Sequence, residues 1–285
     1  MTILVLGATG NTGAEVVKQL QAKGASFLAM VRNVQSASRL GLAPAQIRVG
    51  DFYDVASLVQ AMQGVSSVYL AMAAHPDNRQ WVSNVLEAMK RSGASHLVKL
   101  SGMGAAETAG SEIIRTHAQT DRLVLSSGLT YTLLQPNSFY QNLFASVESI
   151  KATGQFFLPL REARQSVVDI RDVAAVAVAA LTEPGHDNKT YQLSGPEALT
   201  FSEQAAILSE LAGKSIRYVA VSRSAAEQAM LAAGMEAWLA ERLAEILDWF
   251  AEGHYDEVTD DVETVLGRPA RTFRAFAEEM VSLVK

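Results

Sequence analysis

The chain has 285 residues, of which 24 are Lys or Arg and 30 are Asp or Glu, so its formal net charge is −6. This acidic balance argues against a nucleic-acid-binding surface, which needs clustered Lys and Arg side chains. Because the chain has no cysteine, disulfides, thiolate metal sites and a cysteine nucleophile are excluded. The longest apolar stretch, Val173 to Leu181, is too short to span a membrane, and the N-terminus has no signal-peptide pattern. We therefore expect a soluble cytoplasmic protein.

The first half of the chain alternates short apolar runs, rich in β-branched residues, with longer segments of helical spacing. The expected strands are Ile3–Leu6, Phe27–Val31, Ile47–Val49, Ser67–Ala71, His96–Leu100 and Thr130–Leu134. The expected helices between them are Thr12–Gln21, Val55–Met62, Arg79–Ser92 and Glu112–Ser126. Alternating strands and helices with continuously apolar strands predict an α/β fold of the Rossmann type, a doubly wound parallel sheet covered on both faces.

After Pro136 the pattern changes. The segment from Gly154 to Pro159 predicts a small hairpin or loop, and a strand-and-helix unit over Ser166–Thr182 and a strand at Thr190–Leu193 follow it. Further helices are expected at Phe201–Ala212, Ser224–Ala233, Glu236–Ala251 and Arg271–Val284. We therefore expect two domains. Residues 1–153, with 166–193 completing the sheet, form the dinucleotide-binding domain, and residues 194–285, with 154–165, form a smaller, mostly helical substrate lobe.

A glycine motif follows the first expected strand and opens the first expected helix. It reads Gly7, Ala8, Thr9, Gly10, Asn11, Thr12 and Gly13, which is G-x-x-G-x-x-G. The first glycine permits a tight turn, the second lets the backbone approach a pyrophosphate, and the third lets the helix pack on the sheet. The helix N-terminus then offers N–H groups and a positive dipole to the phosphates. The motif therefore predicts a dinucleotide cofactor.

The end of the second strand indicates which dinucleotide is bound. An NAD site places an acidic residue about 20 residues beyond the glycines, where it binds the ribose 2′-hydroxyl. No acidic residue occurs between Glu15 and Asp51, whereas Arg32 follows the second strand. A guanidinium matches a 2′-phosphate in charge and in geometry, so we expect NADP(H). The alternative is that Arg32 is an ordinary solvated side chain.

Ligands of such sheets lie at the carboxyl ends of the strands, which adds positions to the expected cofactor site. Asp51 and Phe52 would contact the adenine, although Asp51 could instead cap the following helix. The expected cofactor site also contains the residues at the ends of the fourth, fifth and sixth strands, which are Ala71, Met72, Ala73, Ser101, Gly102 and Pro136.

Several segments together resemble the NmrA-like group of atypical short-chain dehydrogenase/reductases. They are Gly7–Gly13, Val31–Asn33, Gly50–Asp51, Leu134–Asn142, Val168–Ala174, Tyr191–Glu197 and Val258–Pro269. This resemblance covers nearly the whole chain, and it implies a likeness to NADPH-dependent quinone oxidoreductases and triphenylmethane-dye reductases. The same group contains transcriptional co-repressors that bind a dinucleotide without turning it over. The resemblance therefore implies hydride transfer to a flat, conjugated small molecule, with a non-catalytic redox sensor that acts through a protein partner as the alternative.

The resemblance also implies where the proton donor of a short-chain reductase would lie. Typical members carry a Tyr-x-x-x-Lys pair on the helix before the sixth strand, in which the lysine lowers the pKa of the tyrosine. Here that stretch runs from His117 to Asp121 and contains neither residue. Reduction of a quinone gives a stabilised anion and demands less of a proton donor, so a histidine with a near-neutral pKa would be sufficient. The alternative is that His117 is a partly buried residue with local hydrogen bonds.

One aromatic residue is the second candidate at the acceptor. Tyr140 follows Pro136 and could stack on a flat substrate, although packing in the core is its alternative role. The histidines His75, His96, His186 and His254 lack the spacing of metal ligands, so we expect no metal site. No pattern indicates the oligomeric state, and a homo-oligomer is left open.

Overall fold

The computed structural model describes residues 2–284, apart from the side chain of Arg39. The chain forms two compact units, which are described separately. Unit 1 contains the residues up to Glu107, together with Thr116–Gln135 and Ile170–Gln192. Unit 2 contains Thr108–Arg115, Pro136–Asp169 and the residues from Leu193 onward. Residues 136–153 group with unit 2, whereas we expected them in the dinucleotide-binding domain.

Unit 1 is built on a sheet of seven strands among the described residues, in the order β3-β2-β1-β4-β5-β6-β8. The strands are β1 (Ile3–Leu6), β2 (Phe27–Val31), β3 (Ile47–Val49), β4 (Ser67–Leu70), β5 (His96–Leu100), β6 (Thr130–Pro136) and β8 (Lys189–Leu193). Each neighbouring pair from β3 to β6 is parallel. The order reverses at β1, so the ends of β1 and β4 form the topological switch point at which ligands bind in such sheets.

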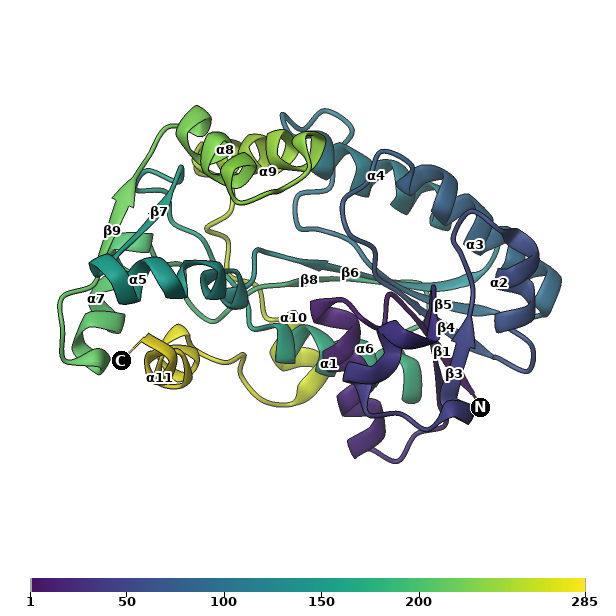
Figure 1. The fold of residues 1–285 in the computed structure, drawn as a ribbon. Helices are drawn as coiled ribbons and strands as arrows, with labels where there is room; N and C mark the ends of the chain where they lie inside the picture. The colour runs from purple at the N-terminus through teal and green to yellow at the C-terminus, as the bar shows by residue number, and fades with distance from the viewer. Residues whose placement is uncertain (1, 285) are drawn as a thin grey trace. The chain divides into compact units, whose positions relative to one another are not determined.

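Helices cover both faces of this sheet. They are α1 (Asn11–Ala22), α2 (Val55–Ala61), α3 (Asn78–Ser92), α4 (Glu112–Leu125) and α6 (Ile170–Thr182), with the short 3-10 helices η1 (Val34–Leu40) and η2 (Pro44–Gln46). Figure 1 shows α1 and α6 side by side on one face and α2, α3 and α4 on the other. The three-layer α/β fold is therefore the one expected from the alternating pattern.

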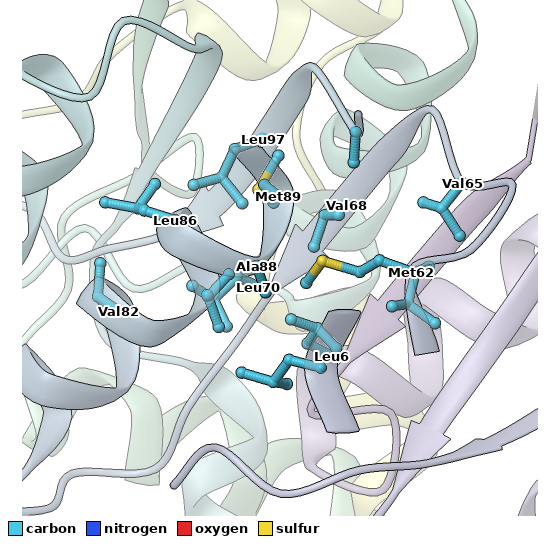
Figure 2. Close-up of a cluster of buried hydrophobic side chains, with 14 of the residues drawn as sticks. Leu6, Met62, Val65, Val68, Leu70, Val82, Leu86, Ala88, Met89 and Leu97 are labelled. Carbon is cyan, nitrogen blue, oxygen red and sulfur yellow. The ribbon is translucent and has the colours of Figure 1, made fainter. Parts of the chain in front are cut away.

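The core on the α2–α4 face explains why the strands could be read from the sequence. Figure 2 shows part of it, with Leu6, Val68 and Leu70 of the strands packed near Leu86 and Met89 of α3. The side chains of β1 and β4 are buried on both faces of the sheet, as parallel strands between two helical layers require. Continuous apolar runs are therefore the correct sequence pattern for these strands.

Unit 2 is mostly helical but contains two paired strands. Its elements are η3 (Tyr140–Ser146), α5 (Val147–Thr153), β7 (Gln155–Leu158), α7 (Phe201–Ala212), β9 (Arg217–Ala220), α8 (Arg223–Ala232), α9 (Ala237–Phe250), α10 (Asp261–Leu266) and α11 (Phe273–Val284). β7 pairs with β9 in parallel, α11 packs against α7, and α8 packs against α9. Within the described part of the chain, no helix is long and apolar enough to cross a membrane.

The main differences from the expected elements lie in unit 2. Gly154–Pro159 is not a hairpin, because its strand pairs with β9, a strand that the sequence pattern does not predict. The segment from Ser166 contains isolated bridges, such as Phe139 with Val168, in place of a strand before α6. The helices α5 and α10 are also additional, and both are short.

Candidate cofactor and active site

The glycine loop between β1 and α1 is a tight backbone turn. Gly7 has a φ of +80°, and a Cβ atom on it would lie 2.0 Å from the carbonyl oxygen of Ala71. A Cβ atom on Gly13 would lie 2.1 Å from the carbonyl oxygen of Gly7. Around Gly10 the nearest atom to such a Cβ would be 3.4 Å away. Gly7 and Gly13 are thus required for the packing of the loop, whereas a Cβ atom on Gly10 would meet no atom closer than van der Waals contact.

The N-terminus of α1 has the features of an anion site. Gly10 is its N-cap and forms no side-chain hydrogen bond to the first turn, which contains no acidic residue. The first-turn N–H groups therefore remain for a ligand, and the helix dipole favours negative charge there. Within this loop Ala8 and Thr12 are buried, while Thr9 and Asn11 are exposed. The loop fits the pyrophosphate of a dinucleotide.

The end of β2 presents a cation. Arg32 is exposed and has no hydrogen-bond or ion-pair partner among residues 2–284. Close to this strand end, Gly50 lies against Met30, because a Cβ atom on Gly50 would come 2.7 Å from the Met30 sulfur. An unpaired guanidinium fits a phosphate on the adenosine ribose better than it fits a bare hydroxyl.

The end of β3 resolves one alternative left open by the sequence. Asp54, and not Asp51, is the N-cap of α2, because its carboxylate accepts a hydrogen bond from the Ala56 N–H. Asp51 accepts a hydrogen bond from the Tyr53 N–H and is exposed. The capping role suggested for Asp51 is therefore wrong. Phe52 is half-buried and stacks on Trp81 with 5.4 Å between the ring centroids.

The segment after β4 brings backbone close to the glycine loop. The carbonyl oxygen of Ala71 is the atom that excludes a side chain at Gly7. Met72 is partly buried and packs against the core on the α2–α4 face. Ala73 is exposed, and its carbonyl oxygen accepts a hydrogen bond from Asn78. The backbone of this segment, with its small side chains, can therefore adjoin a bound cofactor.

A buried polar cluster connects β5, β6 and α4, and we call it the Asp121 cluster. The Asp121 carboxylate accepts hydrogen bonds from Lys99 Nζ at 2.8 Å, from Ser101 Oγ at 2.6 Å and from Gln135 Nε2 at 3.2 Å. The side chains of Lys99 and Asp121 are only 1% and 7% exposed. Burial lowers the pKa of Lys99, and the negative charge of Asp121 opposes this shift.

His117 lies one turn before Asp121 on α4. Its Cδ2 atom would be 3.1 Å from a Cβ atom on Gly102, so the ring lies directly against the backbone after β5. The carbonyl oxygen of His117 accepts a hydrogen bond from Thr120, but its ring nitrogens form none with the described residues. The alternative that the His117 ring is held by local hydrogen bonds is therefore not supported.

The electrostatic setting of His117 differs from the expected one. Burial, and then the positive charge of Lys99, lowers the pKa of His117 to about 4, although the charge of Asp121 acts in the opposite direction. The ring is therefore uncharged at neutral pH, and the expectation of a near-neutral pKa is wrong. The physical reasons are burial of the ring, which is the larger cause, and the adjacent ammonium group of Lys99, which disfavours a second positive charge.

Lys99 is a buried charged residue beside this site that the sequence interpretation missed. It lies in the centre of β5, in the run His96-Leu97-Val98-Lys99-Leu100. A lysine in a strand that is otherwise buried is a signal in itself, because a buried ammonium group needs an anionic partner. The partner could not be identified from spacing, since Asp121 is 22 positions away on another element.

The two remaining predicted residues, Tyr140 and Pro136, belong to unit 2 and are buried. The Tyr140 ring is 2% exposed and packs against Phe273 and Phe276, with centroid distances of 5.3 and 5.5 Å. The ring is thus covered by protein, so Tyr140 packs in the core and is not free to stack on a substrate. Among the described residues, no three His, Asp or Glu side chains form a metal-binding group.

These features define the class of the protein. A doubly wound parallel sheet, whose first strand leads through a glycine turn to an uncapped helix N-terminus, is the structure of a Rossmann-type dinucleotide-binding protein. Residues 7–184 match the family model described as NAD(P)H-binding, and the chain belongs to this family. Its relatives confirm the expected likeness to the NmrA-like quinone and dye reductases.

Three relatives illustrate this likeness. The NAD(P)H azoreductase of Xenophilus azovorans is 40% identical over 276 residues, which cover 97% of this chain and 96% of the relative. The crystal structure of an Escherichia coli NADPH-dependent quinone oxidoreductase with NADPH superposes with a TM-score of 0.87 at 27% identity, covering 98% and 99% of the two chains. The triphenylmethane reductase of Citrobacter sp. with NADP(H) superposes with a TM-score of 0.84 at 28% identity over the full length of both chains.

Proposed function

We propose that the protein is an NADPH-dependent oxidoreductase that reduces azo compounds, quinones or other flat, conjugated acceptors. The observation that carries this proposal is the 40% identity to an NAD(P)H azoreductase over nearly the whole of both chains. The glycine loop and the unpartnered Arg32 support NADPH as the reductant. The expected cytoplasmic location belongs to this proposal as well.

Each part of the site has a separate task in this proposal. The loop from Gly7 to Gly13 and the N-terminus of α1 hold the pyrophosphate, and Arg32 pairs with the 2′-phosphate. The reduced nicotinamide, when bound, supplies the hydride. Ser101 and Gly102 lie beside the nicotinamide, since ligands of such sheets bind at the carboxyl ends of the strands. His117 then faces the acceptor with a ring nitrogen that has no partner in the protein.

The acceptors proposed here suit such a site. Reduction of a quinone places negative charge on oxygen that the ring delocalises, so proximity and one hydrogen bond lower the barrier sufficiently. A cationic dye accepts hydride without any proton. A strong general acid is therefore not required.

The direct test is oxidation of NADPH by the purified protein with azo dyes, quinones and triphenylmethane dyes, beside the same reactions with NADH. We expect turnover that is faster with NADPH for at least one acceptor class. His117→Ala should reduce kcat by roughly tenfold to a hundredfold while the Kd for NADPH stays unchanged. Tight NADPH binding without turnover of any acceptor would instead favour the non-catalytic sensor.

A further inference from the structure

The Asp121 cluster places an ammonium group in the interior of unit 1, where no role in binding the cofactor phosphates can explain it. Lys99 is 1% exposed and has its Nζ atom 2.8 Å from Asp121 Oδ1. The β5 side chains on both sides of it in sequence are apolar. Transfer of both charges out of water costs several kcal/mol per ion, and apolar residues of similar volume often stabilise a fold as well or better. A buried pair of this kind therefore indicates a role besides stability.

The pair also fixes the geometry around it. The second carboxylate oxygen of Asp121 accepts hydrogen bonds from Ser101 and Gln135, so one side chain of α4 is held by β5 and by β6 at the same time. His117 is one helical turn away on α4, and its ring edge lies against Gly102. A hydrogen-bonded carboxylate with three donors thus sets the position of the turn that carries His117.

The charges that act on the His117 ring are few. Among the described residues, Lys99 from β5 and Asp121 from α4 are the groups whose charges act on the ring, and Asp121 is hydrogen-bonded to Lys99 and to the uncharged Gln135 of β6. The ring nitrogens make no hydrogen bond within the described chain, so they are available to a ligand. Because Asp121 is shared among three donors, its capacity to stabilise an imidazolium is reduced.

We propose that His117 donates a hydrogen bond to the reduced acceptor as an uncharged imidazole. The buried Lys99–Asp121 pair holds the helical turn that carries His117 and keeps its ring uncharged. This proposal rests on the proposed function, because it concerns the acceptor side of that same site. The low pKa of His117, to which Lys99 contributes, agrees with it. An uncharged ring accommodates anionic products and cationic dyes alike, whereas an imidazolium would repel a cationic acceptor.

The proton balance follows from this arrangement. Hydride transfer adds two electrons and one hydrogen to the acceptor, and a quinone then carries one negative charge. The N–H of His117 is shared with that oxygen as a hydrogen bond and stays on the imidazole. The proton that completes the hydroquinone comes from water.

The test removes the positive charge of Lys99 and follows His117 directly. NMR titration of the imidazole signals, assigned by their loss in His117→Gln, should give a wild-type midpoint below about pH 5. In Lys99→Met we expect this midpoint to rise by at least about one pH unit, because the Asp121 charge is then unopposed. Lys99→Gln keeps a donor toward Asp121 and serves as the second variant if Lys99→Met does not fold.

Turnover with a quinone supplies the second measurement. The pH profile of wild-type kcat/KM should show no change that depends on His117 above about pH 5. The profile of Lys99→Met should instead acquire such a limb, a change of at least about threefold around its raised midpoint. The double variant Lys99→Met/His117→Gln should lose this limb. Lys18→Met, which changes an exposed lysine on α1, is the matched control and should behave as the wild type.

The possible failures are distinct. An unchanged His117 midpoint in both Lys99 variants would overturn the role of Lys99, whatever the activity. A raised midpoint without any limb in kcat/KM would overturn the hydrogen bond from His117 to the acceptor. Absence of turnover in the wild type with every acceptor would instead overturn the proposed function, and the NMR midpoints would still decide whether Lys99 controls the charge of the ring.

Discussion

At the scale of single residues, Arg32 offers the most direct test of cofactor choice. Arg32→Glu replaces an exposed cation at the end of β2 with an anion that repels the 2′-phosphate. We expect the Kd for NADPH to rise by roughly tenfold to a hundredfold, which corresponds to about 1.4 to 2.7 kcal/mol, and the Kd for NADH to change little. Fluorescence titration with both cofactors measures this.

The control for that variant is Arg91→Glu, which makes the same charge change at the exposed end of α3. It should leave both dissociation constants near the wild-type values. If Arg32→Glu raised the Kd for NADPH and the Kd for NADH equally, Arg32 would not be the residue that recognises the 2′-phosphate.

The depressed pKa of His117 makes a second residue-scale prediction, about stability. Its folded-state pKa of about 4 lies below the ordinary value of 6.5, so the unfolded chain binds more protons between these pH values. The free energy of unfolding therefore falls as the pH falls from about 6.5 toward 4. Between pH 7 and pH 5 the contribution of His117 should be about 1 to 2 kcal/mol.

Urea unfolding of wild type and His117→Gln at both pH values isolates this contribution. His96 also has a pKa lowered by burial, and its effect has the same sign but is common to both proteins. The wild type should lose more stability than the variant on acidification. If both lose the same amount, the His117 ring is not kept uncharged by the fold.

Site positions that follow a strand in the sequence could be predicted, whereas contacts between residues of different elements could not. The glycines of the loop and Arg32 lie at fixed distances from a strand, so pattern and chemistry together indicate their roles. The Asp121 cluster instead joins residues of β5, β6 and α4 that are far apart in the sequence. Tyr140 shows the opposite case, because a residue near the expected cleft proved to be part of an aromatic core.

At the scale of elements, two glycines of the β1–α1 loop should differ in their roles, because Gly13 is needed for packing and Gly10 for cofactor binding. Gly13→Ala would bring a Cβ atom against the Gly7 backbone, and Gly10→Ala would meet nothing closer than 3.4 Å. We expect Gly13→Ala to lower the free energy of unfolding by about 1 to 3 kcal/mol and to impair NADPH binding. Gly10→Ala should fold with nearly wild-type stability and still bind NADPH more weakly.

Thermal unfolding and NADPH titration of the two variants test this difference. Gly10→Ala is the matched control for Gly13→Ala, because neither glycine has a positive φ and the two variants differ in the space around the added Cβ atom. A Gly13→Ala protein as stable as the wild type would contradict the close contact between α1 and the loop.

The sequence pattern of each element explains whether it could be predicted. β1 and β2 of unit 1 are continuous apolar runs, and most of the strand limits in this unit agree with the expected ones. β9, with the sequence Arg217-Tyr218-Val219-Ala220, has two exposed residues and neither an apolar run nor a clear alternation. Its pairing with β7 joins segments about 60 residues apart, and such long-range pairing leaves no local pattern.

At the scale of the whole molecule, cofactor binding should be visible as stabilisation. A ligand present at about 100 times its Kd adds about 2.7 kcal/mol to the free energy of unfolding when it binds the folded state alone. We therefore expect NADPH to raise the Tm by several degrees, and NADH at the same concentration to raise it less. Differential scanning fluorimetry measures both, and Arg32→Glu should remove the difference. Equal shifts from the two cofactors in the wild type would argue against NADP(H) preference.

The packing of α1 against α6 has a consequence for synthesis of the chain. Gln19 of α1 donates a hydrogen bond to the carbonyl oxygen of Arg171, 152 positions later, and the two helices pack along one face of the sheet. At a synthesis rate of 5 to 20 residues per second, the apolar side of α1 waits roughly 8 to 30 s for its neighbour. During that interval unit 1 cannot close its second helical layer, so nascent chains expose a surface that chaperones recognise. Folding of unit 1 is thus timed by its last helix and not by the first strands to emerge.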